Sequence, residues 1–342
     1  MMEGSPFSTR DVAATSYVET LRNKLAAPVM GWVERSDALE RATAWLDDIY
    51  AQMKTGADVA ASMVDLHQGL SLLRRKWDRE EWRAFCLEVA RPHPLGTFLC
   101  QCPFTRHGLE RPRGYAGDAA LIDYLYSERT AGQVEPPGSD IYHFMYQQPS
   151  PRSVRERRQL LAREIELSAE RVRLPRLLSV ACGHLREAEQ APAVAEKRIG
   201  ELIAFDQDPL SLAEVTRQHP AGGPVRTVCG SVRSILLGRT RFDSMDLVYS
   251  AGLYDYLAEG TAQRLTRLLF GMLRSGGRLV LGNFAQCPEA GYLEAFMDWW
   301  LVYRDEAQVQ AFTAEIDPAQ IASQEMFRDS EQNVIYLVLT RR

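Results

Sequence analysis

The sequence has few cysteines, and they are not arranged as in a cross-linked or zinc-stabilised domain. Its six cysteines are spread over 342 residues, and only Cys100 and Cys102 lie close together. A tetrahedral metal site needs four ligands with their own spacing. We therefore expect no metal site and predict buried free thiols.

Long hydrophobic runs and an excess of basic residues are also lacking. No run approaches the roughly 18 to 20 apolar residues that span a bilayer, and the N-terminus has no basic segment followed by an apolar one. The net charge of −5 does not favour nucleic acid as a partner. We therefore expect a cytoplasmic protein without a membrane span. Its composition, 46% hydrophobic and 25% charged, is typical of a globular chain with one or two domains.

Residues 176–187 combine an apolar run with a glycine turn. Leu177, Leu178 and Val180 form the run, Gly183 the turn, and a helix-compatible segment starts near Leu185. This pattern is typical of a buried parallel strand that leads into a crossover helix. Because unpaired helix N–H groups face such a turn, it is a common site for ligands.

The same pattern recurs along the second half of the chain. The run 202–205 ends in Asp206, and an acidic residue at the tip of a second strand can accept hydrogen bonds from a ribose diol. Further apolar runs occupy 225–229, 246–250 and 277–282, and the last segments predict a closing hairpin. Strands alternating with helices at these intervals predict a parallel sheet in an α/β fold.

The first half of the chain is predicted to be helical from residue 9 to about 97. Apolar residues recur at helical spacing over 18–29, 39–49 and 63–73. We expect a helical N-terminal domain over 1–158, followed by a second domain over 159–342. The N-terminal helices would either cap an active site or mediate a homodimer, and the sequence does not decide between the two.

Four motifs stand out in this half of the chain: Ser-Val-Ala-Cys-Gly at 179–183, Phe-Asp at 205–206, Cys-Gly-Ser at 229–231 and Asp-Leu-Val-Tyr-Ser at 246–250. They occur in the order found in class I S-adenosylmethionine-dependent methyltransferases, which this half of the chain resembles. The resemblance implies a Rossmann-like, seven-stranded, mostly parallel sheet with an antiparallel C-terminal hairpin. It also implies S-adenosylmethionine as cofactor.

The resemblance assigns cofactor contacts to the predicted strand tips. Gly183 and its neighbours would receive the amino-acid portion, Asp206 the ribose, Gln207 the adenine edge and Ser231 with Val232 the adenine amine. Ser250 and Ala251 would lie near the reactive methyl group. The full set is Ala181, Cys182, Gly183, Asp206, Gln207, Gly230, Ser231, Val232, Ser250 and Ala251.

The glycine loop departs from the family pattern. The usual Gly-x-Gly-x-Gly reads Ala181-Cys182-Gly183-His184-Leu185, so only the central glycine is kept. This departure weakens an NAD-type interpretation, which needs the tight glycine turn for a pyrophosphate. An α/β domain with an unrelated ligand, or a cofactor-binding subunit without catalysis, remains an alternative.

Three further segments resemble a bacterial subfamily typified by the 3-hydroxypalmitic acid methyl ester synthase. They are Arg-Gly-Tyr-Ala-Gly-Asp at 113–118, Ser-Ala-Gly-Leu-Tyr-Asp-Tyr-Leu at 250–257 and Trp-Trp-Leu-Val-Tyr-Arg at 299–304. The resemblance implies methyl-ester formation on the carboxylate of a small or lipid-like acid. Many members of this group are natural-product enzymes with other substrates.

A carboxylate acceptor needs positioning and no base, because its pKa near 4 leaves it ionised at neutral pH. The sequence offers arginines that could hold a carboxylate and tyrosines that could donate beside it. The predicted catalytic residues are Arg113, Tyr115, Tyr142 and Tyr254, and the predicted substrate residues are Arg111, Asp118, Arg152, Arg155, Trp299, Tyr303 and Arg304. We interpret Arg157 and Arg158 as a solvated surface.

A hydroxyl or amine of a secondary metabolite is the alternative acceptor. A hydroxyl would need a proton acceptor within hydrogen-bond reach, for which His143 and His184 are candidates. A contact with backbone or cofactor is the favoured role of His184, because it lies within the glycine loop.

Overall fold

The computed structural model describes residues 32–56 and 58–342, which divide into two compact units. The helical unit comprises the described residues up to Glu110 with 133–144 and 288–299, and the sheet unit comprises 111–132, 145–287 and 300–342. The expected boundary at residue 158 is corrected, because it falls inside the continuous helix α9 (Pro149–Arg171). Segments distant in the sequence therefore build each unit.

The helical unit packs through the apolar stripes that the sequence predicts. Ala42, Leu46 and Ile49 of one helix and Met63 and Leu66 of the next are fully buried. The stripe expected over 18–29 lies outside the described residues. The elements are α2 (Trp32–Lys54), α3 (Val59–Lys76), α4 (Arg79–Ala84), the π-helix η1 (Phe85–Ala90), α5 (Pro94–Leu99), α6 (Pro103–Glu110), most of α8 (Gly138–Tyr146) and α14 (Ala290–Met297).

One buried carboxylate links three segments of this unit. Glu294 of α14 accepts two hydrogen bonds from the Arg74 guanidinium, at 2.7 and 2.9 Å, and a third from the Trp82 indole at 2.6 Å. Removing one partner of such a buried pair leaves an uncompensated charge. Residues 288–299 therefore depend on partners more than 200 positions earlier in the chain.

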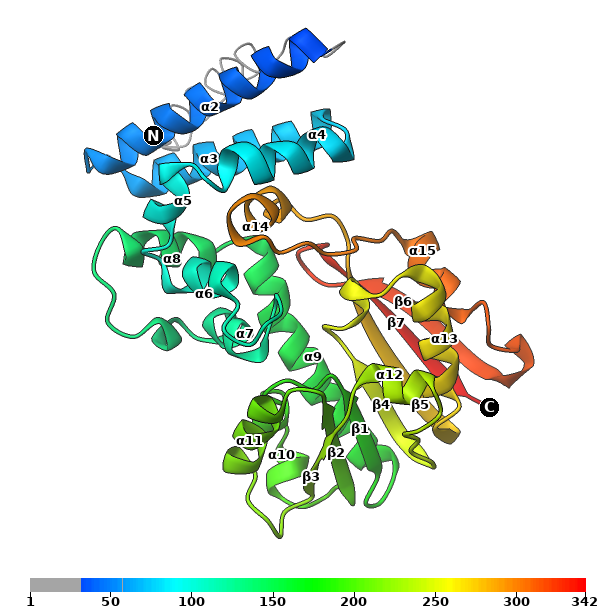
Figure 1. Cartoon of the computed structure of the whole chain (residues 1–342). Coiled ribbons are helices and arrows are strands. Elements are labelled where there is room, and N and C mark those ends of the chain that lie inside the picture. The colour runs from blue at the N-terminus through cyan, green and yellow to red at the C-terminus, as the bar shows by residue number, and fades with distance from the viewer. Residues whose placement is uncertain (1–31, 57) are drawn as a thin grey trace, which may run out of the picture. The chain divides into compact units, whose positions relative to one another are not determined.

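The sheet unit contains seven strands in the order β3-β2-β1-β4-β5-β7-β6 (Figure 1). The first five are parallel, while β7 runs antiparallel to both β5 and β6. This arrangement confirms the predicted mostly parallel sheet and its closing hairpin. The strands are β1 (Arg176–Val180), β2 (Glu201–Asp206), β3 (Val225–Cys229), β4 (Met245–Ser250), β5 (Leu273–Phe284), β6 (Ile321–Arg328) and β7 (Val334–Arg341).

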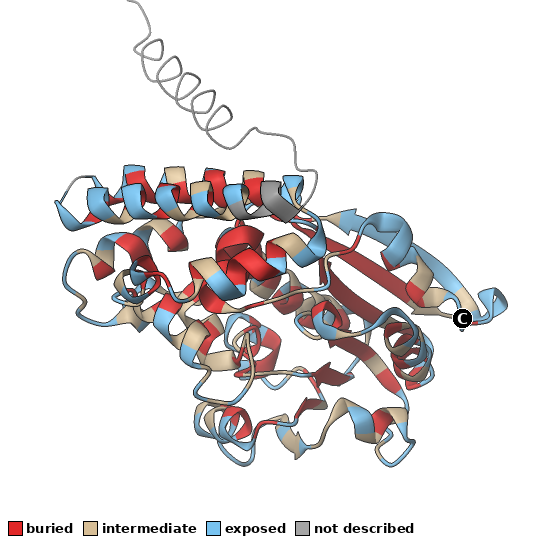
Figure 2. Ribbon diagram, turned by 45° about the horizontal axis from the view of Figure 1, so that its top comes forward, coloured by how far each residue is buried: buried red, intermediate tan, exposed pale blue. Residues whose placement is uncertain are grey.

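Both faces of the sheet are covered, which explains why the central strands read as continuous apolar runs. Because successive side chains alternate between faces, Leu177 packs in the core formed with α9, whereas Leu178 packs in the core of the opposite face. The central strands are accordingly buried (Figure 2). The first face is covered by α9, α10 (Pro192–Ala195) and α11 (Pro209–Gln218), and the second by α12 (Val232–Leu236), α13 (Glu259–Phe270) and the 3-10 helix η5 (Ala311–Thr313).

Smaller elements complete the sheet unit. In the sequence, the short helix α7 (Ala119–Tyr126) lies between the first and second segments of the helical unit, and α15 (Glu306–Gln310) precedes the hairpin. The remaining 3-10 turns are η2 (Glu128–Ala131), η3 (Ala188–Gln190), η4 (Tyr254–Tyr256) and η6 (Pro318–Gln320).

The expected helix near Leu185 is not formed. Leu185 has φ of 53°, a left-handed conformation that an α-helix cannot contain. The chain instead makes turns as far as the 3-10 helix η3 and the short helix α10. Within the residues that the structure describes, no helix is both long and apolar enough to cross a membrane.

Candidate functional site

The carboxyl ends of four parallel strands meet at one edge of the sheet. Val180 pairs with Phe205, and Asp206 pairs with Cys229, so β1, β2 and β3 end at the same level. On the other side of β1, Ser179 pairs with Tyr249 of β4. The structure thus brings together the predicted cofactor segments 181–183, 206–207, 230–232 and 250–251.

The loop after β1 is left-handed at every second residue. Ala181, Gly183 and Leu185 have φ of 55°, 54° and 53°. These are the three positions at which the Gly-x-Gly-x-Gly pattern carries glycine. A left-handed alanine or leucine costs roughly 1–2 kcal/mol, so the chain keeps the loop geometry at an energetic cost. Strain of this kind is characteristic of functional sites.

Asp206 connects this loop to the end of β2. Its carboxylate accepts the Gly183 N–H at 2.8 Å and the Asp208 N–H at 2.9 Å, one on each oxygen. Burial raises the pKa of Asp206 more than these hydrogen bonds lower it. Each carboxylate oxygen has a second lone pair, so Asp206 can still accept hydrogen bonds from a diol.

The end of β3 approaches β2 closely. A side chain on Gly230 would lie 2.6 Å from the Phe205 ring, which only glycine avoids. Ser231 is the N-cap of α12, yet its hydroxyl makes no capping hydrogen bond. Gln207 is exposed and Val232 is half-buried. These side chains leave a polar hydroxyl and amide beside Asp206.

The end of β4 is tied to β1. The Ser250 hydroxyl donates to the Val180 carbonyl at 2.9 Å, and the Ala251 carbonyl accepts from Arg157. Burial raises the pKa of the Cys182 thiol well above its ordinary value. Cys182 is therefore a neutral thiol and does not act as a nucleophile.

The predicted loop 111–118 lies against the start of α11. Arg113 contacts the Asp208 carboxylate at 2.6 Å, the Ser211 hydroxyl at 2.9 Å and His184 at 3.3 Å. Burial would raise the pKa of Asp208, but the hydrogen bonds from Arg113 and Ser211 lower it overall. Arg113 thus positions the loop.

Tyr115 remains beside the acidic groups at the end of β2. Its hydroxyl lies 3.4 Å from an Asp208 oxygen. Burial, followed by the charges of Asp206 and Asp208, raises the pKa of Tyr115. Tyr115 is therefore a neutral donor at physiological pH.

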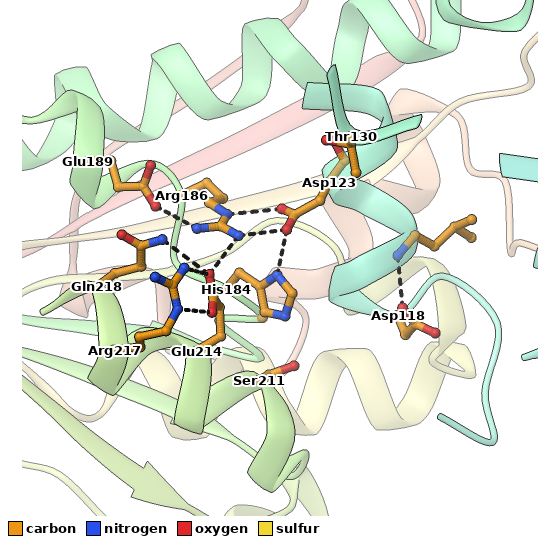
Figure 3. Close-up of polar contacts among 12 residues, drawn as sticks. Asp118, Asp123, Thr130, His184, Arg186, Glu189, Ser211, Glu214, Arg217 and Gln218 are labelled. Atoms are coloured by element: carbon orange, nitrogen blue, oxygen red, sulfur yellow. Dashed lines mark hydrogen bonds and ion pairs between the residues drawn. The ribbon is translucent and has the colours of Figure 1, made fainter. Parts of the chain in front are cut away.

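A charged network fastens α7 to the loop after β1 (Figure 3). Asp123 lies 2.8 Å from His184 Nδ1 and 2.6 Å from Arg186 Nη2. Arg186 also contacts Glu189 at 2.8 Å and Glu214 of α11 at 2.9 Å. The His184 ring is thus engaged by the side chains of Asp123 and Arg113, whereas the sequence favoured a contact with backbone or cofactor.

The structure corrects two predicted site residues near the end of β4. The Tyr254 side chain is fully buried, and its hydroxyl contacts Thr266 at 3.0 Å within the hydrophobic core. Arg304 is buried and donates to the Tyr254 and Leu257 carbonyls and to Asn283. Both side chains stabilise the fold, because their polar groups are engaged by the protein itself.

The two predicted arginines at the start of α9 are also engaged. Arg152 contacts the Glu331 carboxylate at 2.6 Å on the surface. Arg155 donates to the carbonyls of Leu125 and Tyr146, both at 3.1 Å, and stacks on the Tyr146 ring. These contacts correct their assignment to substrate binding.

The remaining predicted residues are dispersed. Asp118 is buried and caps α7 by accepting the Leu121 N–H at 2.8 Å. Arg111 begins the loop with φ of 48°, and the Tyr303 hydroxyl lies 3.9 Å from the Cys287 sulfur. Tyr142 and Trp299 are buried in the helical unit.

The sequence interpretation missed Arg157. It was expected on a solvated surface, but it is only 7% exposed. Arg157 lies on the same helical stripe as Val154, Leu161 and Ile165, which are buried. A charged residue within an apolar stripe was the signal that could have revealed it.

Comparisons with known proteins find similar folds among solved structures but no matching sequence family. No family model matches the chain, and no curated protein matches its sequence. A protein of Bordetella parapertussis, described as a possible exported protein, is similar with a TM-score of 0.55 and 20% identity, over 82% of this chain and 95% of its own.

Two further solved structures are methyltransferases by name. The magnesium protoporphyrin IX methyltransferase of Synechocystis has a TM-score of 0.44 and 14% identity, over 66% of this chain and 100% of its own. An N-methyltransferase of Bradyrhizobium japonicum has a TM-score of 0.40 and 16% identity, over 66% of this chain and 99% of its own. At these identities the likeness concerns the fold alone.

Among the described residues, no three His, Cys, Asp or Glu side chains come together as a metal site.

Proposed function

We propose that the chain is an S-adenosylmethionine-dependent O-methyltransferase that forms a methyl ester on the carboxylate of a small or lipid-like acid. The observation that carries the proposal is the connection of Asp206 to the left-handed loop after β1. It supports a site for a ribose and its attached groups at the carboxyl edge of the sheet, where ligands bind in open α/β folds.

The residues present fit this cofactor. Asp206 can accept the ribose hydroxyls, and the Ser231 hydroxyl, which makes no capping hydrogen bond, can accept or donate at the adenine edge. Gly230 lets β3 approach Phe205, and Ala181, Cys182 and Gly183 offer backbone groups to the amino-acid portion. When bound, S-adenosylmethionine supplies an electrophilic methyl group.

Methyl transfer needs the acceptor oxygen in line with the methyl carbon and its leaving group. Ser250 fixes the end of β4 by its hydrogen bond to Val180, and so holds Ala251 in place. Tyr115 stays protonated and can donate to the acceptor. A carboxylate needs no more than this positioning.

An alternative acceptor is a hydroxyl or amine of a secondary metabolite, and one observation favours it. Burial raises the pKa of Asp255 to about 6, despite the hydrogen bond from the Phe284 N–H and the nearby Arg157 and Arg304. A carboxyl group of this pKa is suited to accept a proton near neutral pH.

The test is calorimetry with S-adenosylmethionine and S-adenosylhomocysteine, followed by transfer of a radiolabelled methyl group to 3-hydroxy fatty acids, aromatic acids and phenols. We expect binding, and base-labile label on an acid. Label on phenols only would favour the alternative acceptor. Binding without any transfer would indicate a cofactor-binding subunit, and no binding would overturn the proposal.

Asp206→Ala is the matched variant for this experiment. We expect its affinity for S-adenosylhomocysteine to fall at least about tenfold, because two charge-assisted hydrogen bonds are lost. Asp243→Ala, on the surface beside Arg241, should bind as the parent protein does. Unchanged affinity in Asp206→Ala would remove the ribose assignment.

The proposal includes a cytoplasmic location and membership of the methyl-ester-forming subfamily. All six cysteines are free, which supports a reducing compartment. Cell fractionation tests the location, and ester formation on 3-hydroxy fatty acids tests the subfamily. A homodimer through the N-terminal helices remains a prediction, and part of those helices lies outside the described residues.

A further inference from the structure

Buried polar side chains gather beside the end of β4, and we call Tyr126, Arg157 and Tyr336 the Arg157 cluster. Arg157 of α9 donates to the Ala251 carbonyl and forms a hydrogen bond with Tyr126 of α7. A Cβ built on Gly252 would lie 3.7 and 3.8 Å from its two terminal nitrogens. The guanidinium therefore lies directly against the backbone after β4.

Arg157 has no ion-pair partner among the residues that the structure describes, although it is only 7% exposed. Arg157 interacts electrostatically with two acidic groups, Glu187 and Asp255. Glu187 accepts the Tyr249 hydroxyl at 2.9 Å, and Asp255 accepts the Phe284 N–H at 2.6 Å. A buried guanidinium without a contacting anion is costly, so an anion from outside the chain would complete the cluster.

Tyr336 supplies an independent observation. Its side chain on β7 is fully buried and stacks on Phe327 with ring centroids 5.3 Å apart. Its hydroxyl has no hydrogen-bond partner in the described part of the chain. Among the charged groups, Arg157 has the largest effect on the pKa of Tyr336, so the two side chains lie within electrostatic range of each other. Buried hydroxyls are normally hydrogen-bonded, and the Tyr336 hydroxyl can still donate a hydrogen bond to a ligand.

We propose that Tyr126, Arg157 and Tyr336 form a carboxylate-binding site beside Ala251 and Gly252. The inference rests on the proposed function, because Ala251 is where the methyl group would be transferred. Arg157 has five N–H donors in a planar fork, and its two described bonds leave others available. Burial raises the pKa of both tyrosines, so each remains a protonated donor.

Two molecules of the proposed reaction carry a carboxylate, namely S-adenosylmethionine in its amino-acid portion and the acceptor acid. Both would present the same chemistry to the cluster. Decarboxylated S-adenosylmethionine separates them, because it keeps the nucleoside and lacks only the carboxylate. Simple carboxylates such as octanoate and benzoate, compared with their neutral amides, probe the site without any cofactor.

Tyr336→Phe is the informative variant. It removes one unpartnered hydroxyl, so it should fold with a Tm equal to or above that of the parent protein. Its matched control is Tyr254→Phe, which removes a hydroxyl already bonded to Thr266 and should bind every probe as the parent does. Arg157→Gln is the second variant, and circular dichroism establishes whether it is folded.

We expect Tyr336→Phe and Arg157→Gln each to lower the affinity of the protein for one of the carboxylate probes by roughly tenfold. If the cofactor supplies the carboxylate, the parent protein binds S-adenosylmethionine more tightly than its decarboxylated form, and both variants abolish that preference. If the acceptor supplies it, cofactor affinity is unchanged, and the stabilisation of the parent by octanoate or benzoate disappears in both variants.

Failure of this inference is distinguishable from failure of the proposed function. If the folded Tyr336→Phe variant matches the parent with every carboxylate probe, the cluster holds no carboxylate, even where S-adenosylhomocysteine binds. If S-adenosylhomocysteine does not bind but octanoate or benzoate stabilises the parent and not the variants, the carboxylate site stands without the methyltransferase.

Discussion

Ala181 shows most clearly how single residues shape the site. It has φ of 55° and is exposed, so no packing compensates for its left-handed conformation. Gly183, two residues on, has the same conformation, and a Cβ there would lie 3.1 Å from the Cβ of Ala119. We therefore expect a glycine at position 181 to stabilise the protein and an alanine at position 183 to destabilise it.

We expect Ala181→Gly to stabilise the protein by up to about 1 kcal/mol, because relief of the left-handed strain exceeds the added entropy of the unfolded chain. Gly183→Ala should destabilise it by about 1–2 kcal/mol for the same conformational reason, plus the close contact with Ala119. Urea unfolding measures both. Equal shifts of one sign would show that φ at these residues does not control the loop.

Asp255 predicts a pH dependence of stability. Burial raises its pKa to about 6, and the ordinary value is 3.8. Between these values the folded protein binds a proton that the unfolded chain does not, so stability is full below the ordinary value and falls as pH rises towards 6. At 1.36 kcal/mol per unit, the loss approaches about 3 kcal/mol.

The Asp255→Asn variant should not lose stability in this way as pH rises towards 6. An amide oxygen can still accept the Phe284 N–H and has no proton to release. Subtracting the pH profile of the variant from that of the parent isolates Asp255 from other carboxyl groups. A difference profile that is flat between pH 4 and 6 would mean that Asp255 has an ordinary pKa.

At the scale of elements, the network around Asp123 determines how α7 is attached. The pKa of Asp123 is lowered, because hydrogen bonds from His184 and Arg186 outweigh the effect of burial. Its stabilisation is therefore present above the ordinary pKa and lost as pH falls through the folded value.

Asp123→Asn should lower the free energy of unfolding by about 1–3 kcal/mol at pH 7, because charge-assisted hydrogen bonds become neutral ones. Hydrogen exchange should also increase in α7. The control is Thr130→Ala, which loses an exposed bond to the Asp123 carbonyl at 3.0 Å and should change little. A stability equal to the parent would show that α7 is held by packing alone.

The strands were predictable because burial on both faces gives each one a continuous apolar run. Leu202 to Phe205 and Leu247 to Tyr249 are buried at every position, and sequence reasoning located both. The ends of these strands follow from the parallel arrangement, so Asp206, Gly230 and Ser250 were also placed correctly at one edge.

Side-chain partners were not predictable in the same way. Arg113, Arg155 and Arg304 have the residue type that binds carboxylates, but each is occupied by carbonyls or carboxylates of other segments. Those partners lie up to about a hundred positions away in the sequence. Residue type therefore indicated the chemistry available, whereas three-dimensional contacts decided which groups remain for a ligand.

At the scale of the whole molecule, each compact unit is assembled from separated segments. The chain leaves the sheet unit after Cys287 and returns at Trp300. In between, Glu294 is buried against Arg74 and Trp82 of the helical unit. A domain boundary at one point of the sequence therefore cannot separate the two units.

A fragment comprising residues 159–342 tests this organisation. It contains all seven strands but begins inside α9, and it lacks Asp123, Tyr126 and Arg157 of the sheet unit. It also leaves residues 288–299 without the helices of the helical unit that bury them, so the apolar side chains of Phe296 and Met297 become exposed to water. We expect the fragment to aggregate or to lack a cooperative unfolding transition, and to bind no S-adenosylhomocysteine in calorimetry. A soluble fragment that unfolds cooperatively and binds as tightly as the full chain would restore the boundary at residue 158, and would show that the contacts of α7 and the first half of α9 are dispensable for the site.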